Sequence, residues 1–149
     1  MSTAPSPPLS RLLELTSDLV QGVRAGRSAT DLMQRCPADA RAAVQALGFD
    51  VLRRLGSATE LRALLAPKAP PPQVDALLCS ALALLWPVPH PPYPDHTLVD
   101  QAVTATRHRA PTAAGFINAV LRRFIRERNA IVAQAERSVL GRSEEHTSE

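Results

Sequence analysis

The stretch AGFINAVLRRFIRER, residues 114–128, decides the fold class predicted for this chain. At about 100° per residue in an α-helix, its large apolar side chains share one arc of the helical wheel. Arg122, Arg123 and Arg126 fall on the opposite side, and the stretch holds no recognisable catalytic group. It therefore predicts a helix that buries one face and presents positive charge to solvent, as in a binding module. The apolar arc consists of Ile117, Val120, Leu121, Phe124 and Ile125.

The composition favours a single all-α domain. The chain has 149 residues, which is enough for one domain with a sizeable core. Apolar residues make up 45% of it and aromatic residues only 3%, which favours a helical bundle over a β-rich core. The formal net charge is +3, and every basic residue except Lys68 is an arginine. Guanidinium groups suit phosphate contacts better than ammonium groups do, so this bias is suggestive of an anionic partner.

About seven helical segments are expected, with no convincing strand and no internal repeat. Gly26 is expected to end the first helix, and Thr30 to cap the second. Gly56 is expected to end the third in the left-handed conformation, while Ser57 and Glu60 have the spacing of a capping box for the fourth. The expected segments are 9–23, 30–36, 37–55, 57–66, 74–86, 97–107 and 111–135.

The segment 74–86 is apolar nearly all round, so it belongs at the centre of the bundle. A proline-dense break at 68–72 precedes it. The stretch 87–94 follows it, and its five prolines predict an extended loop.

Three regions are expected along the chain. Residues 1–8 predict a disordered leader, and 9–137 the helical domain. Residues 138–149 predict a non-native or disordered tail. Within it, 142–149 (RSEEHTSE) resembles the in-frame translation of a sequencing adapter, so the gene is expected to have been cut near Gly141. The alternative is an ordinary polar C-terminus.

Signatures of catalysis are missing from the sequence. The glycines never cluster into a phosphate-binding loop, and the histidines have no metal-ligand spacing with cysteine or carboxylates. Cys36 and Cys79 are lone, which is typical of buried thiols in a reducing compartment. No apolar run reaches the roughly 20 residues that span a bilayer. We therefore expect a cytoplasmic protein without enzyme activity, metal, cofactor or membrane contact of its own.

Basic residues concentrate near the ends of the last two predicted helices. We interpret this cluster as a patch that contacts phosphates, the alternative being that each arginine is simply solvated. The position of Arg128 conflicts with this pattern, because this charged residue falls within the apolar arc. Either its stem lies along the rim of the core or the helix has run past the bundle there. The candidate binding residues are Arg107, His108, Arg109, Arg122, Arg123 and Arg126, with Arg53 and Arg54 as secondary candidates.

Three segments carry a resemblance to a known family. FINAVLRRF at 116–124 is similar to the last-helix motif of the NusB-type RNA-binding fold. LGFDVLRRL at 47–55 and PDHTLVDQAV at 94–103 match, in order, two further segments of the RsmB (Sun/Fmu) family of 16S ribosomal RNA cytosine-C5 methyltransferases. The resemblance covers about Leu9 to Ala135, and it is most like the N-terminal domain of that family.

The resemblance implies an RNA-binding module that helps to present ribosomal RNA to a C-terminal methyltransferase domain. S-adenosylmethionine and the nucleophilic cysteine belong to that second domain, and we expect this chain to be truncated before it. The family often has a basic start to its first helix, where this chain has only Arg11, so RNA contact is expected in the Arg107–Arg128 region instead. The alternatives are a stand-alone NusB-like antitermination factor and a protein-docking bundle without direct RNA contact.

Overall fold

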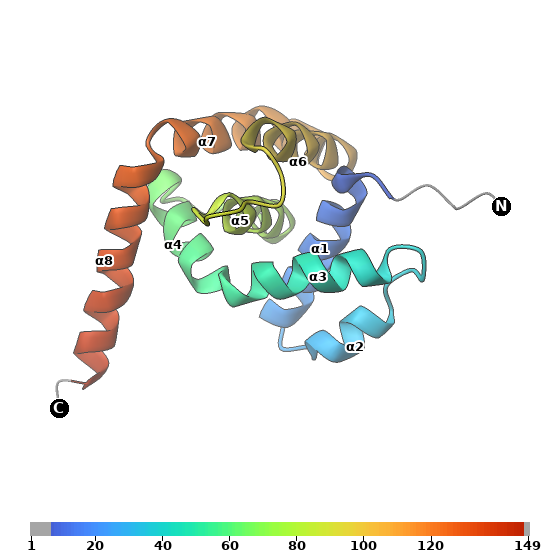
Figure 1. The fold of residues 1–149 in the computed structure, drawn as a ribbon, viewed down its shortest axis with the longest axis horizontal. Coiled ribbons are helices and arrows are strands. Elements are labelled where there is room, and N and C mark those ends of the chain that lie inside the picture. Colours follow the sequence, from blue (N-terminus) through green and yellow to red (C-terminus); the bar gives the residue numbers. More distant parts are fainter. Residues whose placement is uncertain (1–6, 148–149) are drawn as a thin grey trace.

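The computed structural model describes residues 7–147, and it describes side chains up to Leu140. Within this range the chain forms α-helices, one short 3₁₀ helix and no strand, which confirms the all-α prediction (Figure 1). The elements are α1 (Leu9–Arg24), α2 (Ala29–Gln34), α3 (Arg41–Arg53), α4 (Leu55–Leu65), α5 (Pro72–Leu85), α6 (Asp95–Arg109), η1 (Pro111–Ala113), α7 (Ala114–Arg126) and α8 (Arg128–Thr147).

Helix α5 lies at the centre of the bundle, as its apolar sequence predicts. Every residue from Ala76 to Leu85 is buried, and α1, α3, α4, α6 and α7 all pack around it. The helix begins at Pro72, where the missing N–H of proline costs no hydrogen bond. It ends at Leu85, before the proline-rich loop that the sequence predicts.

The N-terminal helix α1 packs against α3, α5 and α6 and ends at the predicted glycine. Gly26 has a φ of 90°, a left-handed conformation that glycine adopts without steric cost. The N–H of Arg27 then donates to the carbonyl of Gly22 at 3.0 Å, which closes the turn. The turn leads directly into α2, which packs on both α1 and α3.

Several predicted helix ends are wrong. Helix α2 begins at Ala29 and is capped by Ser28, not Thr30, since the Ser28 hydroxyl accepts from the Asp31 N–H at 3.4 Å. Helix α3 begins at Arg41 because Pro37–Ala40 form a separate turn, in which the Ala40 N–H donates to the Pro37 carbonyl.

The boundary between α3 and α4 also differs from the prediction. The chain turns at Arg54, whose N–H donates to the carbonyls of Asp50 and Val51. This turn needs no left-handed residue. Gly56 therefore lies inside α4 without a positive φ, and Ser57 caps nothing.

The single long helix expected at 111–135 is instead η1, α7 and α8. The break falls at Glu127, which has a φ of −114° and a ψ of 21°. Arg128 opens α8, where its guanidinium lies 2.7 Å from the Asp95 carboxylate and 5.7 Å from the centre of the Phe124 ring. Arg128 therefore belongs to α8 and not to α7. Its side chain lies along the rim of the core, which is one of the two outcomes expected from its place in the apolar arc.

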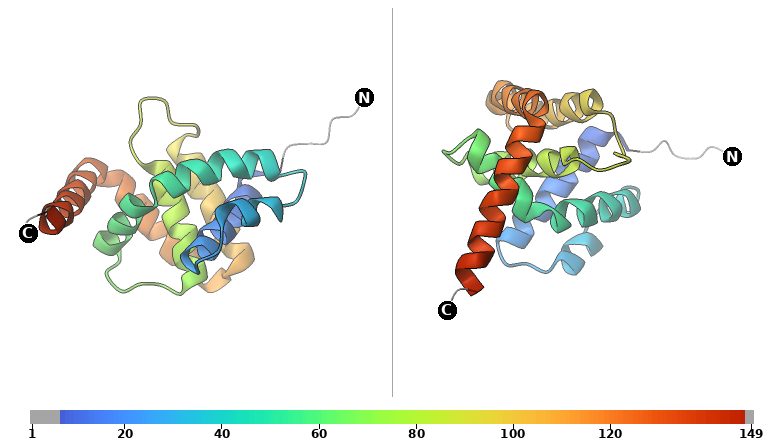
Figure 2. Two further views of the ribbon diagram at one scale, coloured as in Figure 1. Left: turned by 90° about the horizontal axis from the view of Figure 1, so that it is seen from below. Right: turned by 60° about the vertical axis from the view of Figure 1, so that its left-hand side comes forward.

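Helix α8 packs mainly on α4, and its C-terminal half extends beyond the other helices (Figures 1 and 2). Ile131, Val132 and Ala135 are the buried residues of its packing face. Its backbone is helical to Thr147, through most of the stretch predicted as a tail. The side chains of 141–149 and residues 1–6 of the predicted leader lie outside the described residues, so the adapter hypothesis stays a prediction.

Candidate nucleic-acid interface

Helices α6 and α7 form a polar hollow that contains two of the predicted arginines. The two helices pack against each other along the upper edge of the molecule in Figure 1. Small residues at the start of α7 leave room between them for Arg107 from α6 and Arg122 from α7. We call this site the α6–α7 hollow, and its lining consists of Asp100, Val103, Thr104, Arg107, Ala114, Gly115, Asn118 and Arg122.

Arg122 is oriented by a neighbour on its own helix. Its Nε donates to Oδ1 of Asn118 at 3.0 Å, one turn earlier in α7. This bond fixes the plane of the guanidinium and leaves its two terminal nitrogens without a described partner. Arg107 is exposed and makes no side-chain ion pair or hydrogen bond with a described residue. Asp100 is the one acid in the lining, so the α6–α7 hollow carries a net positive charge.

His108 and Arg109 point toward α1 instead. The Glu14 carboxylate accepts from Nε of Arg109 at 2.8 Å and lies 2.5 Å from Nδ1 of His108. Arg109 also donates through both terminal nitrogens to Asp18, at 2.8 Å and 3.1 Å. The hydrogen bond with Asp18 is the main cause that raises the pKa of Arg109. These two predicted site residues therefore join α6 to α1, and the charge of Arg109 is balanced within the fold.

Arg123 and Arg126 lie on α7 but outside the α6–α7 hollow. Arg123 donates to Glu127 at 3.1 Å and to the carbonyl of Leu65 at 3.4 Å, which connects α7 to the end of α4. Arg126 is exposed and lines a separate hollow at the α7–α8 junction together with Asp95 and Arg128. The predicted cluster is thus divided among four locations: the α6–α7 hollow, the contact with α1, the end of α4 and the α7–α8 junction.

The secondary candidates, Arg53 and Arg54, are at the end of α3 on another part of the surface. Arg53 pairs with Asp50 at 2.8 Å, and its guanidinium lies 5.6 Å from the centre of the exposed Phe49 ring. Helix α3 contacts α1, α2, α4 and α5, so this pair is remote from the α6–α7 hollow.

Phe116 is a candidate that the sequence analysis missed. It is 39% exposed and follows Gly115, which lines the α6–α7 hollow. Phe116 does not itself line that hollow; it lines a separate groove with Lys68 and the prolines that precede α5. An exposed aromatic ring can stack on a nucleic-acid base. Its position outside the apolar arc of 114–128 was the signal that could have identified it.

Among the described residues, no three His, Cys, Asp or Glu side chains come together in a way that could hold a metal ion. Cys36 and Cys79 are both buried free thiols. None of the described helices has the length and apolar character needed to cross a membrane.

Comparison with known proteins finds a family model that matches most of the chain. The model of the NusB family matches residues 14–126, which run from α1 to the end of α7 and include every predicted site residue. None of the curated proteins compared with the chain matches it. A NusB domain is a non-catalytic helical domain, consistent with the expectation that this chain is not an enzyme.

Proposed function

Because the chain belongs to the NusB family, we propose that it binds RNA and holds the phosphates in the α6–α7 hollow. The observation that carries this proposal is the meeting of Arg107 and Arg122, from two helices, in one polar hollow where neither forms an ion pair with a described residue. Two guanidiniums side by side can each offer parallel N–H donors to the oxygens of one phosphodiester or of two consecutive ones.

The proposal predicts affinity that depends steeply on salt and weakly on sequence. Phosphate contacts release counterions, so the logarithm of the binding constant falls linearly with the logarithm of salt concentration. For a single strand the slope is about −0.7 per neutralised phosphate. Because the two arginines are the cationic donors of the hollow, we expect phosphates rather than base identity to dominate the affinity.

The test is a matched pair of double charge reversals measured by fluorescence anisotropy with a labelled single-stranded RNA. R107E/R122E removes both arginines of the α6–α7 hollow. R27E/R137E removes two exposed arginines elsewhere, neither of which has a described side-chain partner, and changes the net charge equally. We expect the first variant to weaken binding by about tenfold or more and the salt slope to fall by about 1–2, with little change for the second.

An equal loss of affinity in both variants would overturn the hollow as the binding site. Undetectable or salt-insensitive binding by the folded wild-type chain would overturn RNA binding altogether. The chain would then be better described as a protein-docking bundle.

We further propose that the domain is natively the N-terminal module of a 16S ribosomal RNA cytosine-C5 methyltransferase, and that its RNA partner is ribosomal. The support is the resemblance in three ordered segments, together with the arginines four and five residues after Asn118 and the proline-rich loop 87–94. S-adenosylmethionine would then be bound by the following domain, to which no residue of this chain corresponds.

Sequencing the source DNA through the codon for Gly141 tests this finer proposal. A frame that continues into a glycine-rich region for S-adenosylmethionine and a catalytic cysteine supports it. A stop codon near Glu149 contradicts it and favours a stand-alone antitermination factor of the NusB kind.

A further inference from the structure

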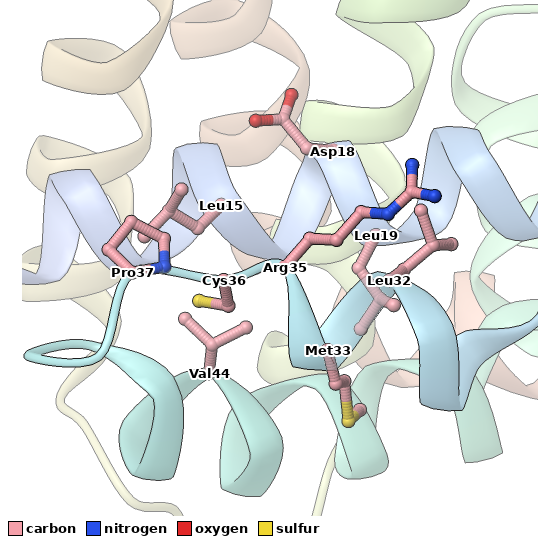
Figure 3. Close-up of a pocket in the computed structure, with 9 residues that line it drawn as sticks. All are labelled: Leu15, Asp18, Leu19, Leu32, Met33, Arg35, Cys36, Pro37 and Val44. Carbon is pink, nitrogen blue, oxygen red and sulfur yellow. The ribbon is translucent and has the colours of Figure 1, made fainter.

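A second site lies at the other end of the molecule, where α2 packs on α1 and α3. Figure 3 shows the side chains that line an open pocket between these helices; most of them are apolar, and Asp18 and Arg35 are the charged members. We call it the α2 pocket. Its lining consists of Leu15, Asp18, Leu19, Leu32, Met33, Arg35, Cys36, Pro37 and Val44.

Two glycines lie close to side chains that line the α2 pocket. A Cβ at Gly22 of α1 would lie 2.6 Å from the Leu32 side chain. A Cβ at Gly48 of α3 would lie 2.6 Å from Leu19 and 3.3 Å from Met33. Leu19, Leu32 and Met33 therefore pack closely on the backbones of α1 and α3, where only a glycine leaves room for them. Met33 adds adaptability, because an unbranched thioether fits many apolar shapes.

The size of the pocket indicates what it can hold. Its volume is about 180 Å³. Sites for drug-sized ligands and cofactors occupy about 300–1,000 Å³, whereas a cavity of about 150 Å³ lined by aliphatic residues binds benzene. The α2 pocket thus accepts one aromatic ring or one branched aliphatic side chain.

The charged groups at the mouth of the pocket favour a ligand that carries an acidic residue next to the inserted apolar side chain. Asp18 is already held by both terminal nitrogens of Arg109. Arg35 has no described side-chain partner. Arg41 donates only to the backbone carbonyls of Gln34 and Cys36, so no carboxylate balances it.

Asp39 follows the lining residue Pro37 by two positions and is itself paired with Arg11 at 2.7 Å. Of the two charged side chains in the lining, Asp18 is paired with Arg109 and Arg35 has no described carboxylate partner, so the unbalanced charge at the pocket is positive.

We propose that the α2 pocket binds an acidic protein segment, which inserts one large apolar side chain and places a carboxylate on Arg35. A buried anchor surrounded by complementary charge is the usual way in which a small interface obtains its affinity. Nucleic acid fits this site poorly, because the walls are apolar. In Figure 1 α2 lies at the lower right and α6–α7 at the upper edge, so the two sites are on different parts of the molecule.

The test titrates a synthetic peptide into the full chain and follows methyl resonances by NMR. The probe is an acetylated heptapeptide with phenylalanine at its centre and two acidic residues on each side. We expect shifts at the methyl groups of Leu19, Leu32 and Met33, and a dissociation constant raised by about tenfold in the Arg35→Glu variant. The matched control is Arg137→Glu on α8, which should bind the peptide as the wild type does.

Two further peptides separate anchor from charge. A peptide with serine at the centre should leave the pocket methyl groups unshifted, and one with lysine flanks should bind at least about tenfold more weakly. Equal binding of the acidic and lysine peptides would overturn the proposal. So would a pocket that takes up benzene but never responds to the acidic peptide. RNA binding measured on Arg35→Glu should stay within about twofold of wild type, which separates this proposal from the function of the α6–α7 hollow.

Discussion

Glu14 is a buried carboxylate that holds two helices together. Its side chain is 10% exposed and accepts from Arg109, while His108 lies against the same oxygen. The partners are 94 and 95 residues away in the sequence, on α6. From the sequence, His108 and Arg109 were indistinguishable from Arg107, since no local pattern reports a partner so far along the chain.

Substituting Glu14→Gln should therefore destabilise the fold. The amide keeps the packing volume, but it leaves Arg109 with a weaker acceptor inside a half-buried site. We expect a loss of about 1–3 kcal/mol in the free energy of unfolding, measured by urea denaturation at pH 7. Asp39→Asn, which breaks the exposed pair with Arg11, serves as the control and should cost less than about 1 kcal/mol. Equal losses would contradict a structural role for the Glu14 cluster.

The two cysteines should differ in reactivity. Burial is the main cause that raises the pKa of both Cys36 and Cys79. The thiolate is the reactive form, so a raised pKa lowers the reactive fraction at pH 8, and that fraction grows as the pH rises toward and past 9.

Alkylation with iodoacetamide, followed by mass spectrometry, should modify Cys36 slowly at pH 8 and faster at higher pH. Cys79 has no exposed surface and should react only when the chain is unfolded in urea. Modification of native Cys79 at the rate of Cys36 would show that α5 is not the closed centre of the bundle.

At the scale of the element, local pattern predicts helices well and their ends poorly. The uniform apolarity of 74–86 placed α5 at the centre, because a helix without a polar face can only be buried. The end of α7 could not be found in this way. It depends on the contacts of Arg128 with Asp95 and Phe124, and these exist only after α6 and α7 have packed.

The glycines of α3 and α4 give a direct test of this packing. Gly56 faces open space inside α4, so Gly56→Ala should stabilise the fold by about 0.5–1 kcal/mol through helix propensity. Gly48→Ala gains the same propensity, but it must displace Leu19 and Met33. We expect its free energy of unfolding, measured with urea, to be about 1–2 kcal/mol lower than that of Gly56→Ala. If the two variants are equally stable, α3 does not approach α1 and α2 as closely as described.

At the scale of the whole molecule, the fold and family followed from the sequence, while the candidate site followed only in part. Residues 116–124 identified the NusB fold because the motif combines the core face of α7 with its solvent face. Arg107 and Arg122 were predicted and meet in the α6–α7 hollow, whereas Arg109 is tied to α1 and Arg126 lies elsewhere. A cluster of arginines in the sequence does not show which of them form ion pairs in the fold. Phe116 was missed because an apolar side chain is normally assigned to the core, although its position outside the apolar arc indicated the surface.

RNA is proposed to lie across α6 and α7. A titration of the full ¹⁵N-labelled chain with single-stranded RNA, in which each backbone amide is followed by NMR, tests this placement directly. We expect shifts concentrated in Asp100–Arg107 and Gly115–Arg122, with α2 and the start of α3 unchanged. Shifts that centre on α2 and α3 and leave the α6–α7 hollow unperturbed would contradict it.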